Sequence, residues 1–158
     1  MLGLYLDELD EGLLTLLGSY HFTRESILEF ARKFDPQPFH LDDAAAAAGP
    51  FGSLAASGWH TGAAWMIRYV TTNMEARARL AAQGKVLPEA GPSPGFTDMR
   101  WYMPVRPGDT VSYSCRITGK RDLASRPGWG MLLSHNAGVN QDGELVFSFE
   151  GKVLTARR

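Results

Sequence analysis

The spacing of apolar residues predicts helices in the first half of the chain and strands in the second half. Four apolar residues share the i, i+3, i+4, i+7 spacing of one buried helix face: Ile27, Phe30, Ala31 and Phe34. Thr23 can cap this helix at its N-terminus. The helix is expected to end near Phe34, because Pro36 disfavours the helical conformation at Asp35. Asp35 then lies in a loop whose backbone is stiffened by Pro36 and Pro38.

A longer helix is expected to open at Ser57–Gly58 and to continue from Trp59, because no proline follows before Pro88. Its first turns are apolar on nearly every side: Ala63, Ala64, Trp65, Met66, Ile67 and Val70. Its last turns carry charged residues: Glu75, Arg77 and Arg79. This pattern predicts a central helix that is covered by other structure at its start and reaches solvent at its end. A short alanine helix, 44–48, is expected before it, capped by Asp42.

Segments rich in β-branched and aromatic residues, with partial alternation, predict strands: Leu14–Phe22, Phe96–Met103, Thr110–Lys120, Trp129–Asn140 and Glu144–Thr155. The turns Pro107–Asp109 and Gln141–Gly143 are expected to join consecutive antiparallel strands. Between helix and strands, residues 83–95 are rich in glycine, proline and serine, which fits either an ordered flap or a mobile insert. The order of elements predicts an α+β fold in one domain, 1–158, with an antiparallel sheet wrapped around a long central helix.

Composition narrows the class of protein. With 44% hydrophobic residues, 21% charged residues and a net charge of −1, the chain is typical of a soluble globular protein and unlike a nucleic-acid-binding or membrane protein. Its single cysteine, Cys115, cannot form an internal disulfide and is expected to be buried. Asp7 and Glu8 interrupt the apolar N-terminus, which does not fit a signal peptide. A cytoplasmic protein is expected.

Asp35 and His40 place a carboxylate and an imidazole five residues apart. The N-terminus of the central helix, at Gly58 and Trp59, offers backbone N–H groups that can stabilise a developing oxyanion. These are the parts that acid–base chemistry beside a carbonyl requires. Taken singly, an aspartate in a proline turn or a loop histidine is more often structural. His60, in the first turn of the same helix, is a lesser candidate.

Three segments resemble the MaoC-like (R)-specific enoyl-CoA hydratase and dehydratase family. The segment FDPQPFHLD resembles the family's hydratase motif, with Asp35, Gln37, Pro38 and His40 at the family's spacing. ASGWHT resembles the small-residue and glycine opening of the family's central helix, and MPVRPGDTV resembles the strand and turn that follow it. The resemblance covers most of the chain and implies the hot-dog fold, in which a sheet wraps a central helix and subunits usually pair.

Three positions depart from the family's usual residues. Phe34 stands where glycine commonly precedes the aspartate, Gln37 stands where asparagine is common, and Ser57 stands where histidine often precedes the helix glycine. The first two alter the volume near the aspartate, and the third alters one hydrogen-bond partner. The resemblance therefore implies the type of reaction and leaves the choice of substrate open.

The resemblance implies an enzyme that adds water to a trans-2-enoyl thioester to give an (R)-3-hydroxyacyl thioester, or the reverse dehydration. Asp35 and His40 would be the catalytic residues, and Ser57, Gly58 and Trp59 would bind the substrate. Coenzyme A would enter as part of an acyl-CoA substrate, and no metal or redox cofactor would be needed. A sheet with open edges on one helix also predicts a homodimer or a higher even oligomer, with the acyl chain at the subunit interface.

Other functions remain open on the same fold. A hot-dog thioesterase or acyl-carrier-protein dehydratase typically carries a carboxylate on the central helix. The only acidic residue between Ser57 and Leu80 is Glu75, which lies about four turns beyond Trp59 at 3.6 residues per turn. This spacing argues against both enzymes. The non-enzymatic alternative is an acyl-CoA-binding hot-dog module, which the three departures leave open.

Overall fold

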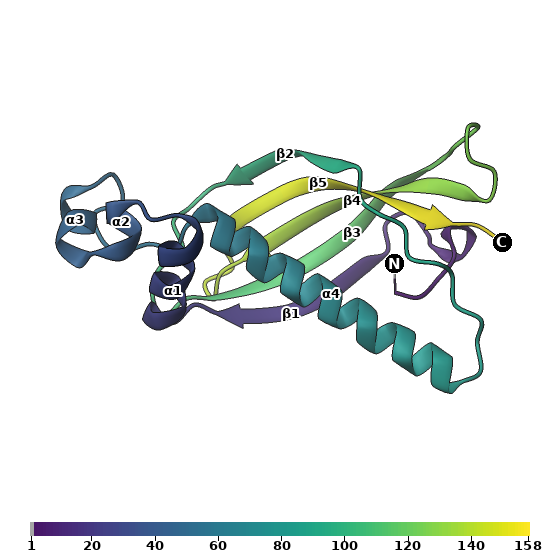
Figure 1. Cartoon of the computed structure of the whole chain (residues 1–158), viewed down its shortest axis with the longest axis horizontal. Helices are drawn as coiled ribbons and strands as arrows, with labels where there is room; N and C mark the ends of the chain where they lie inside the picture. Colours follow the sequence, from purple (N-terminus) through teal and green to yellow (C-terminus); the bar gives the residue numbers. More distant parts are fainter. Residues whose placement is uncertain (1) are drawn as a thin grey trace.

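The computed structural model describes residues 2–158. One antiparallel sheet of five strands lies along a single long helix (Figure 1). The helices are a 3₁₀ turn η1 (Leu6–Glu8), α1 (Arg24–Phe34), α2 (Pro38–Leu41), α3 (Asp43–Ala48) and α4 (Gly58–Ala82). The strands are β1 (Leu14–His21), β2 (Gly95–Trp101), β3 (Thr110–Asp122), β4 (Trp129–Val139) and β5 (Leu145–Ala156). This architecture confirms the predicted α+β plan of a sheet on one central helix.

The strand order β1-β3-β4-β5-β2 places β2 at one edge of the sheet, beside β5. The turn at Pro107–Asp109 therefore does not join neighbouring strands as expected, because β2 and β3 lie on different sides of the pair β4 and β5. The turn instead forms two hydrogen bonds with Phe22: the Gly108 N–H donates to the Phe22 carbonyl, and the Phe22 N–H donates to the Asp109 carbonyl. The residues of a turn determine the local bend of the backbone, but they do not determine which strands lie side by side in the sheet. The turn at Gln141–Gly143 does join the adjacent strands β4 and β5.

Alternation along β3 buries every second side chain on one face of the sheet. The buried members are Val111, Tyr113, Cys115 and Ile117. Cys115 is fully buried, as predicted, and burial raises the pKa of its thiol to about 11. The Tyr113 hydroxyl donates to the Thr61 carbonyl of α4 at 2.9 Å, which fixes the helix to β3.

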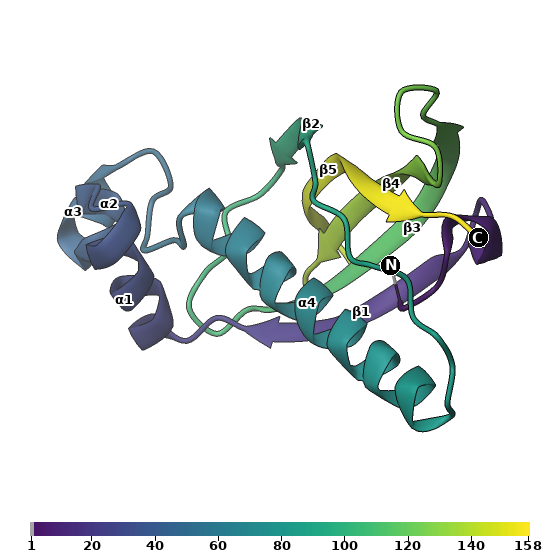
Figure 2. The same ribbon diagram turned by 45° about the vertical axis from the view of Figure 1, so that its right-hand side comes forward.

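Helices α1, α2 and α3 form a group at the end of the sheet where α4 begins, and both chain termini lie toward the opposite end (Figures 1 and 2). Thr23 caps α1 as predicted, since its hydroxyl accepts from the Ser26 N–H at 3.1 Å. The prediction that Phe34 belongs to the buried face was wrong. Phe34 is 69% exposed, because the last turn of α1 extends past the surface that covers Ile27 and Ala31.

The start of α4 is not covered on all sides, contrary to expectation. His60, Thr61, Ala64 and Trp65 are buried, but a set of apolar residues on the helix is exposed: Trp59, Met66, Ile67, Val70 and Met74. The sheet covers only one side of a helix, so a helix that is apolar all round keeps an apolar face in solvent when nothing else covers it. We call this set the exposed α4 face.

The segment between α4 and β2 lies against β5. Ala90 forms an isolated bridge with Thr155, and the Leu154 N–H donates to the Pro92 carbonyl at 3.0 Å. A Cβ atom at Gly91 would lie 2.1 Å from the Leu154 carbonyl oxygen, so glycine permits this close approach. These contacts hold residues 90–92 of the expected flap against β5. No helix within residues 2–158 has the length and apolar character needed to cross a membrane.

Candidate active site

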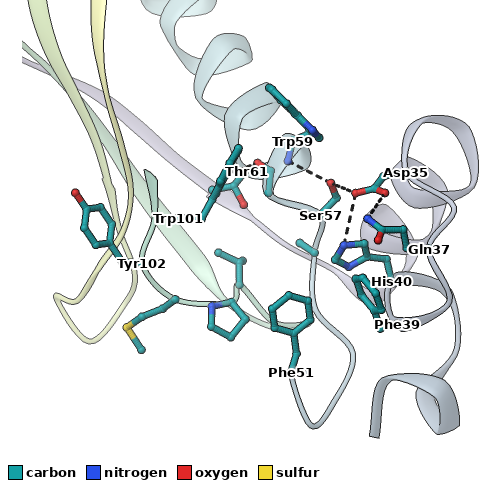
Figure 3. A pocket seen from close by; sticks show the side chains of 15 residues that line it. Asp35, Gln37, Phe39, His40, Phe51, Ser57, Trp59, Thr61, Trp101 and Tyr102 are labelled. Carbon is teal, nitrogen blue, oxygen red and sulfur yellow. Dashed lines mark hydrogen bonds and ion pairs between the residues drawn. The ribbon is translucent and has the colours of Figure 1, made fainter. Parts of the chain in front are cut away.

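The end of α1 and the start of α4 meet at one cavity of about 370 Å³. Asp35 is the C-cap of α1, as predicted, and its N–H donates to the Ala31 carbonyl at 2.9 Å. His40 was expected in a loop but lies in the one-turn helix α2, because Pro38 takes the first helical position, where its missing N–H costs nothing. Figure 3 shows Asp35, Gln37 and His40 on one side of the cavity and Trp101 and Tyr102 on the other.

His40 is buried, and its hydrogen bonds define which ring nitrogen faces the carboxylate. Nδ1 lies 2.8 Å from the Ala55 carbonyl oxygen, which can only accept, so Nδ1 carries a proton. Nε2 then lies 3.5 Å from Asp35 Oδ2. In the neutral imidazole this nitrogen is a hydrogen-bond acceptor. The Ala55 carbonyl thus leaves the basic nitrogen of His40 turned toward Asp35.

The Asp35 carboxylate is held by two side-chain donors. The Ser57 hydroxyl donates to Oδ2 at 2.6 Å, and Gln37 Nε2 donates to Oδ1 at 2.8 Å. Burial raises the pKa of Asp35, but the hydrogen bonds from Ser57 and Gln37 outweigh burial and lower the pKa below its usual value, and the positive charge that His40 carries when protonated lowers it further. Asp35 is therefore an anion at neutral pH. A carboxylate and a neutral imidazole nitrogen that face each other form a site for a molecule able to donate two hydrogen bonds.

Ser57 connects this carboxylate to the start of α4. Its hydroxyl oxygen accepts from the Trp59 N–H at 3.2 Å while its proton goes to Asp35 (Figure 3). We expected Ser57 among the substrate-binding residues, and the structure places it between the helix N-terminus and Asp35. The helix opens at Gly58, as predicted. Since the Trp59 N–H is engaged by Ser57, the Gly58 N–H is the donor left at this end of the helix within residues 2–158.

Trp101 was not among the residues proposed from the sequence, yet it packs directly on the helix start. Its Nε1–H donates to the Gly58 carbonyl at 2.8 Å, and its ring meets Trp59 edge to face at 5.5 Å. A Cβ atom at Gly58 would lie 2.6 Å from the Trp101 indole. Gly58 is therefore needed for the contact between α4 and the end of β2. No local signal reveals this contact, because it depends on β2 lying at the sheet edge.

His60, the lesser candidate, lies outside this cavity. Its ring stacks on Phe30 at 4.6 Å, and its Nε2 lies 3.3 Å from the Tyr20 hydroxyl oxygen. Burial lowers the pKa of His60 to about 4. The side chain is a neutral part of the aromatic core between α1 and α4. Within residues 2–158 no group of three or more histidine, cysteine, aspartate or glutamate side chains is arranged to hold a metal ion.

An antiparallel sheet wrapped on one long helix is the hot-dog fold, which this chain shares with solved MaoC-like dehydratases. A family model described as MaoC like domain matches residues 15–128. No curated protein matches the chain. The chain belongs to the MaoC-like dehydratase family.

Solved structures agree with this assignment. A MaoC-like dehydratase from Rhodospirillum rubrum is 34% identical, with a TM-score of 0.81 over 98% of each chain. The R-hydratase PhaJ1 from Pseudomonas aeruginosa is 24% identical, with a TM-score of 0.68 over 98% of this chain and 86% of that one. An (R)-hydratase from A. caviae is 22% identical, with a TM-score of 0.60 over 92% and 96% of the two chains. At these lower identities, the last two show the fold alone.

The hydrogen bond from Ser57 to Asp35 gives a first prediction. In Ser57→Ala the pKa of Asp35 should rise, because the nearest donor to the carboxylate is lost. A reaction that requires ionised Asp35 would then have the acidic limb of its pH profile of kcat/KM moved to higher pH. The profile of enoyl-CoA hydration measures this shift. Ser57→Thr keeps the hydroxyl and serves as control; an unchanged acidic limb in Ser57→Ala would show that Asp35 does not control it.

Proposed function

We propose that this chain catalyses the reversible addition of water to a trans-2-enoyl thioester, with an (R)-3-hydroxyacyl thioester as product and coenzyme A as the carrier of the acyl group. One observation carries the proposal: the Asp35 carboxylate and His40 Nε2 lie 3.5 Å apart in the cavity that Gly58 also lines. Acid–base groups beside an amide donor at a helix N-terminus are what hydration next to a carbonyl needs.

In the proposed mechanism a water molecule donates one hydrogen bond to Asp35 and one to His40 Nε2. The substrate carbonyl oxygen accepts from the Gly58 N–H, which stabilises the enolate formed when the water oxygen attacks C3. One of the two side chains takes the proton that water loses, and the pair then returns that proton to C2 on the same face, which regenerates the starting state of the site. Because the two groups interact closely, their titration belongs to the pair. The proposed reaction needs no metal or redox cofactor.

The thioesterase alternative is less well supported. Glu75, the only acidic residue on α4, is exposed and does not line the cavity. The non-catalytic acyl-CoA-binding module is also less well supported, because Ala55, Ser57 and Gln37 all orient the acid–base pair. Such orientation has no purpose in a site that only binds. Gln37 makes the hydrogen bond to Asp35 directly, so its departure from the usual asparagine keeps the carboxylate engaged.

The test is an enoyl-CoA hydration assay that follows loss of the conjugated enone absorbance. Crotonyl-CoA and longer trans-2-enoyl-CoA thioesters are compared, and the product is resolved by chirality. Hydration to the (R)-alcohol is expected. Saturated acyl-CoA is included to detect thioester hydrolysis. Release of free coenzyme A without hydration would support the thioesterase, and tight acyl-CoA binding without either reaction would support the binding module.

We further propose that two copies pair through the exposed α4 face and the edge of β2. Met66, Ile67 and Val70 would otherwise stay in water, and an open strand edge invites pairing.

Ile67→Glu should convert a dimer into a monomer, because a carboxylate buried at the interface would lose its solvation. Sedimentation at micromolar concentration measures the mass. Ala78→Glu, an added charge on the exposed polar end of α4, should stay dimeric; a monomeric wild type would end this proposal.

A further inference from the structure

Residues 102–109 connect β2 to β3 across the end of the sheet where α4 begins (Figure 1). Hydrogen bonds to other segments hold both ends of this connection. The Tyr102 N–H donates to the Val146 carbonyl at 3.0 Å, and the Gly108 N–H donates to the Phe22 carbonyl at 2.8 Å. Part of the connection lines the active-site cavity. The connection is therefore a fixed support beside the acid–base pair.

The loop formed by residues 51–56, which we call the Ala55 loop, joins this connection to His40. The Ala56 N–H donates to the Val105 carbonyl at 2.8 Å. The Ala55 carbonyl, which belongs to the same peptide group, accepts from His40 Nδ1 at 2.8 Å. Because a peptide group is planar and trans, its N–H and C=O point in opposite directions and can only turn together. The bond to Val105 therefore fixes the direction of the carbonyl that holds His40.

The direction of this carbonyl decides which ring nitrogen of His40 carries the proton. A neutral imidazole has one N–H group, and two acceptors compete for it. The Ala55 carbonyl lies 2.8 Å from Nδ1, and the Asp35 carboxylate lies 3.5 Å from Nε2. The shorter contact keeps the proton on Nδ1, so that Nε2 can accept. If the Ala55 carbonyl turned away, the proton would move to Nε2 and be donated to Asp35.

Arg106 holds the first half of the Ala55 loop. Its Nη2 donates to the Phe51 carbonyl at 2.8 Å, and its Nη1 donates to the Ser53 carbonyl at 3.1 Å and to the Ser53 hydroxyl. Gly52, between these two residues, has a φ of 70°, a conformation that favours glycine and its greater backbone freedom. A planar guanidinium can bind several oxygens at once, which a lysine ammonium does less well. Arg106 thus restrains the flexible part of the loop, two residues before Ala55.

Phe51 gives Arg106 a second route to His40. The Phe51 ring stacks beside the imidazole, with the ring centroids 6.0 Å apart, and both rings line the cavity. We propose that Arg106 is a positioning residue: through the Ala55 loop it keeps the proton of His40 on Nδ1 and leaves Nε2 as the acceptor in the cavity. The effect of Arg106 on catalysis rests on the proposed function. Its effect on the position of the proton rests on the hydrogen bonds of the Ala55 loop alone.

The test is Arg106→Met, which removes the guanidinium and keeps an unbranched side chain. NMR of labelled ring nitrogens, at a pH where the imidazole is neutral, reports the tautomer of His40, whose signal is identified by its loss in His40→Ala. The wild type should be protonated at Nδ1, and Arg106→Met should show a mixture of both tautomers. Turnover of enoyl-CoA hydration should fall by about tenfold to a hundredfold, because a misplaced catalytic group slows the reaction. Arg106→Lys should show the same changes to a smaller degree.

Arg116→Met is the matched control. Arg116 Nη1 also donates to a loop carbonyl, that of Gly12, at 3.1 Å, but Arg116 lies outside the active-site cavity. This variant should keep the wild-type tautomer and turnover, even if its Tm is lower.

Two results would overturn the inference. One is a folded Arg106→Met or Arg106→Lys protein in which His40 stays protonated at Nδ1 alone, whatever its turnover or Tm, since Arg106 would then only stabilise the fold. The other is a mixture of tautomers with undiminished turnover, since the position of the proton would then not matter for the reaction. A mixture in Arg106→Met, with a wild type that does not hydrate enoyl thioesters, would confirm that Arg106 positions His40 and would end the proposed function.

Discussion

Replacing His40 with alanine, or Asp35 with asparagine, is expected to lower the turnover of enoyl-CoA hydration by about 10²-fold or more. Each change removes one of the two groups that would hold and deprotonate water. His40→Ala also leaves the Ala55 carbonyl without its donor, and Asp35→Asn leaves the Ser57 hydroxyl facing a neutral amide. The double variant should lose little beyond the worse single variant, because residues that hold one water act as a unit.

The controls for this prediction change the same residue types elsewhere. His135→Ala removes a histidine that pairs with Glu150 at 2.6 Å outside the active-site cavity, and Asp142→Asn changes an exposed aspartate in the turn between β4 and β5. Both should keep wild-type turnover. Circular dichroism and Tm check that all variants fold. A folded His40→Ala or Asp35→Asn protein with near wild-type turnover would remove that residue from the mechanism.

The pH dependence follows from the lowered pKa of Asp35. A carboxylate whose pKa is lower in the folded protein stabilises the fold above its unfolded pKa of about 3.9. That contribution is lost as pH falls through the lower, folded pKa. Asp35→Asn should therefore reduce the difference in stability between neutral and strongly acidic pH, as measured by urea unfolding across that range.

Gly58→Val is expected to cost about 2.7–4 kcal/mol of transition-state stabilisation, the range found when one oxyanion donor is lost. The first added carbon would already lie 2.6 Å from the Trp101 indole, so either the ring or the helix start must move. Movement of the ring breaks its hydrogen bond to the Gly58 carbonyl, and movement of the helix displaces the Gly58 N–H from the substrate. The loss should appear in kcat/KM for enoyl-CoA hydration.

Gly62→Ala is the matched control for folding. It adds a methyl group one turn later on the same helix, where the nearest atom, on Phe147, would be 3.7 Å away. This variant should fold with an unchanged or higher Tm, since alanine favours a helix interior over glycine. A folded Gly58→Val protein with unchanged kcat/KM would show that the substrate carbonyl binds elsewhere, and the proposed position of the oxyanion donor would be abandoned.

Much of the candidate site could be predicted from a short stretch of sequence. Asp35 and His40 lie only five residues apart, so the backbone between them, fixed at Pro36 and Pro38, brings them together without help from distant segments. The helix start at Gly58 was also predictable, because a serine cap before a proline-free run is a local signal. The catalytic role of these residues stays a prediction.

The sequence did not predict what surrounds these residues. The Ala55 carbonyl that orients His40 and the Trp101 indole on Gly58 are contacts between segments far apart in the chain. Exposure also differed from expectation, since Phe34 points to solvent although its spacing matches a buried face. A helical period shows which side chains share a face, but only the neighbouring elements determine how much of that face they cover.

By itself the sequence determined α1, α3, α4, the strands and the acid–imidazole spacing, because caps, prolines and side-chain alternation act on the backbone within a few residues. The tertiary structure alone decided that β2 pairs with β5, that Ser57 holds Asp35, and that Trp101 packs on Gly58. These pairings depend on the free energy of the whole packed core, in which a segment takes the partner that buries the most apolar surface while satisfying its hydrogen bonds. Local residue preferences carry no information about that choice.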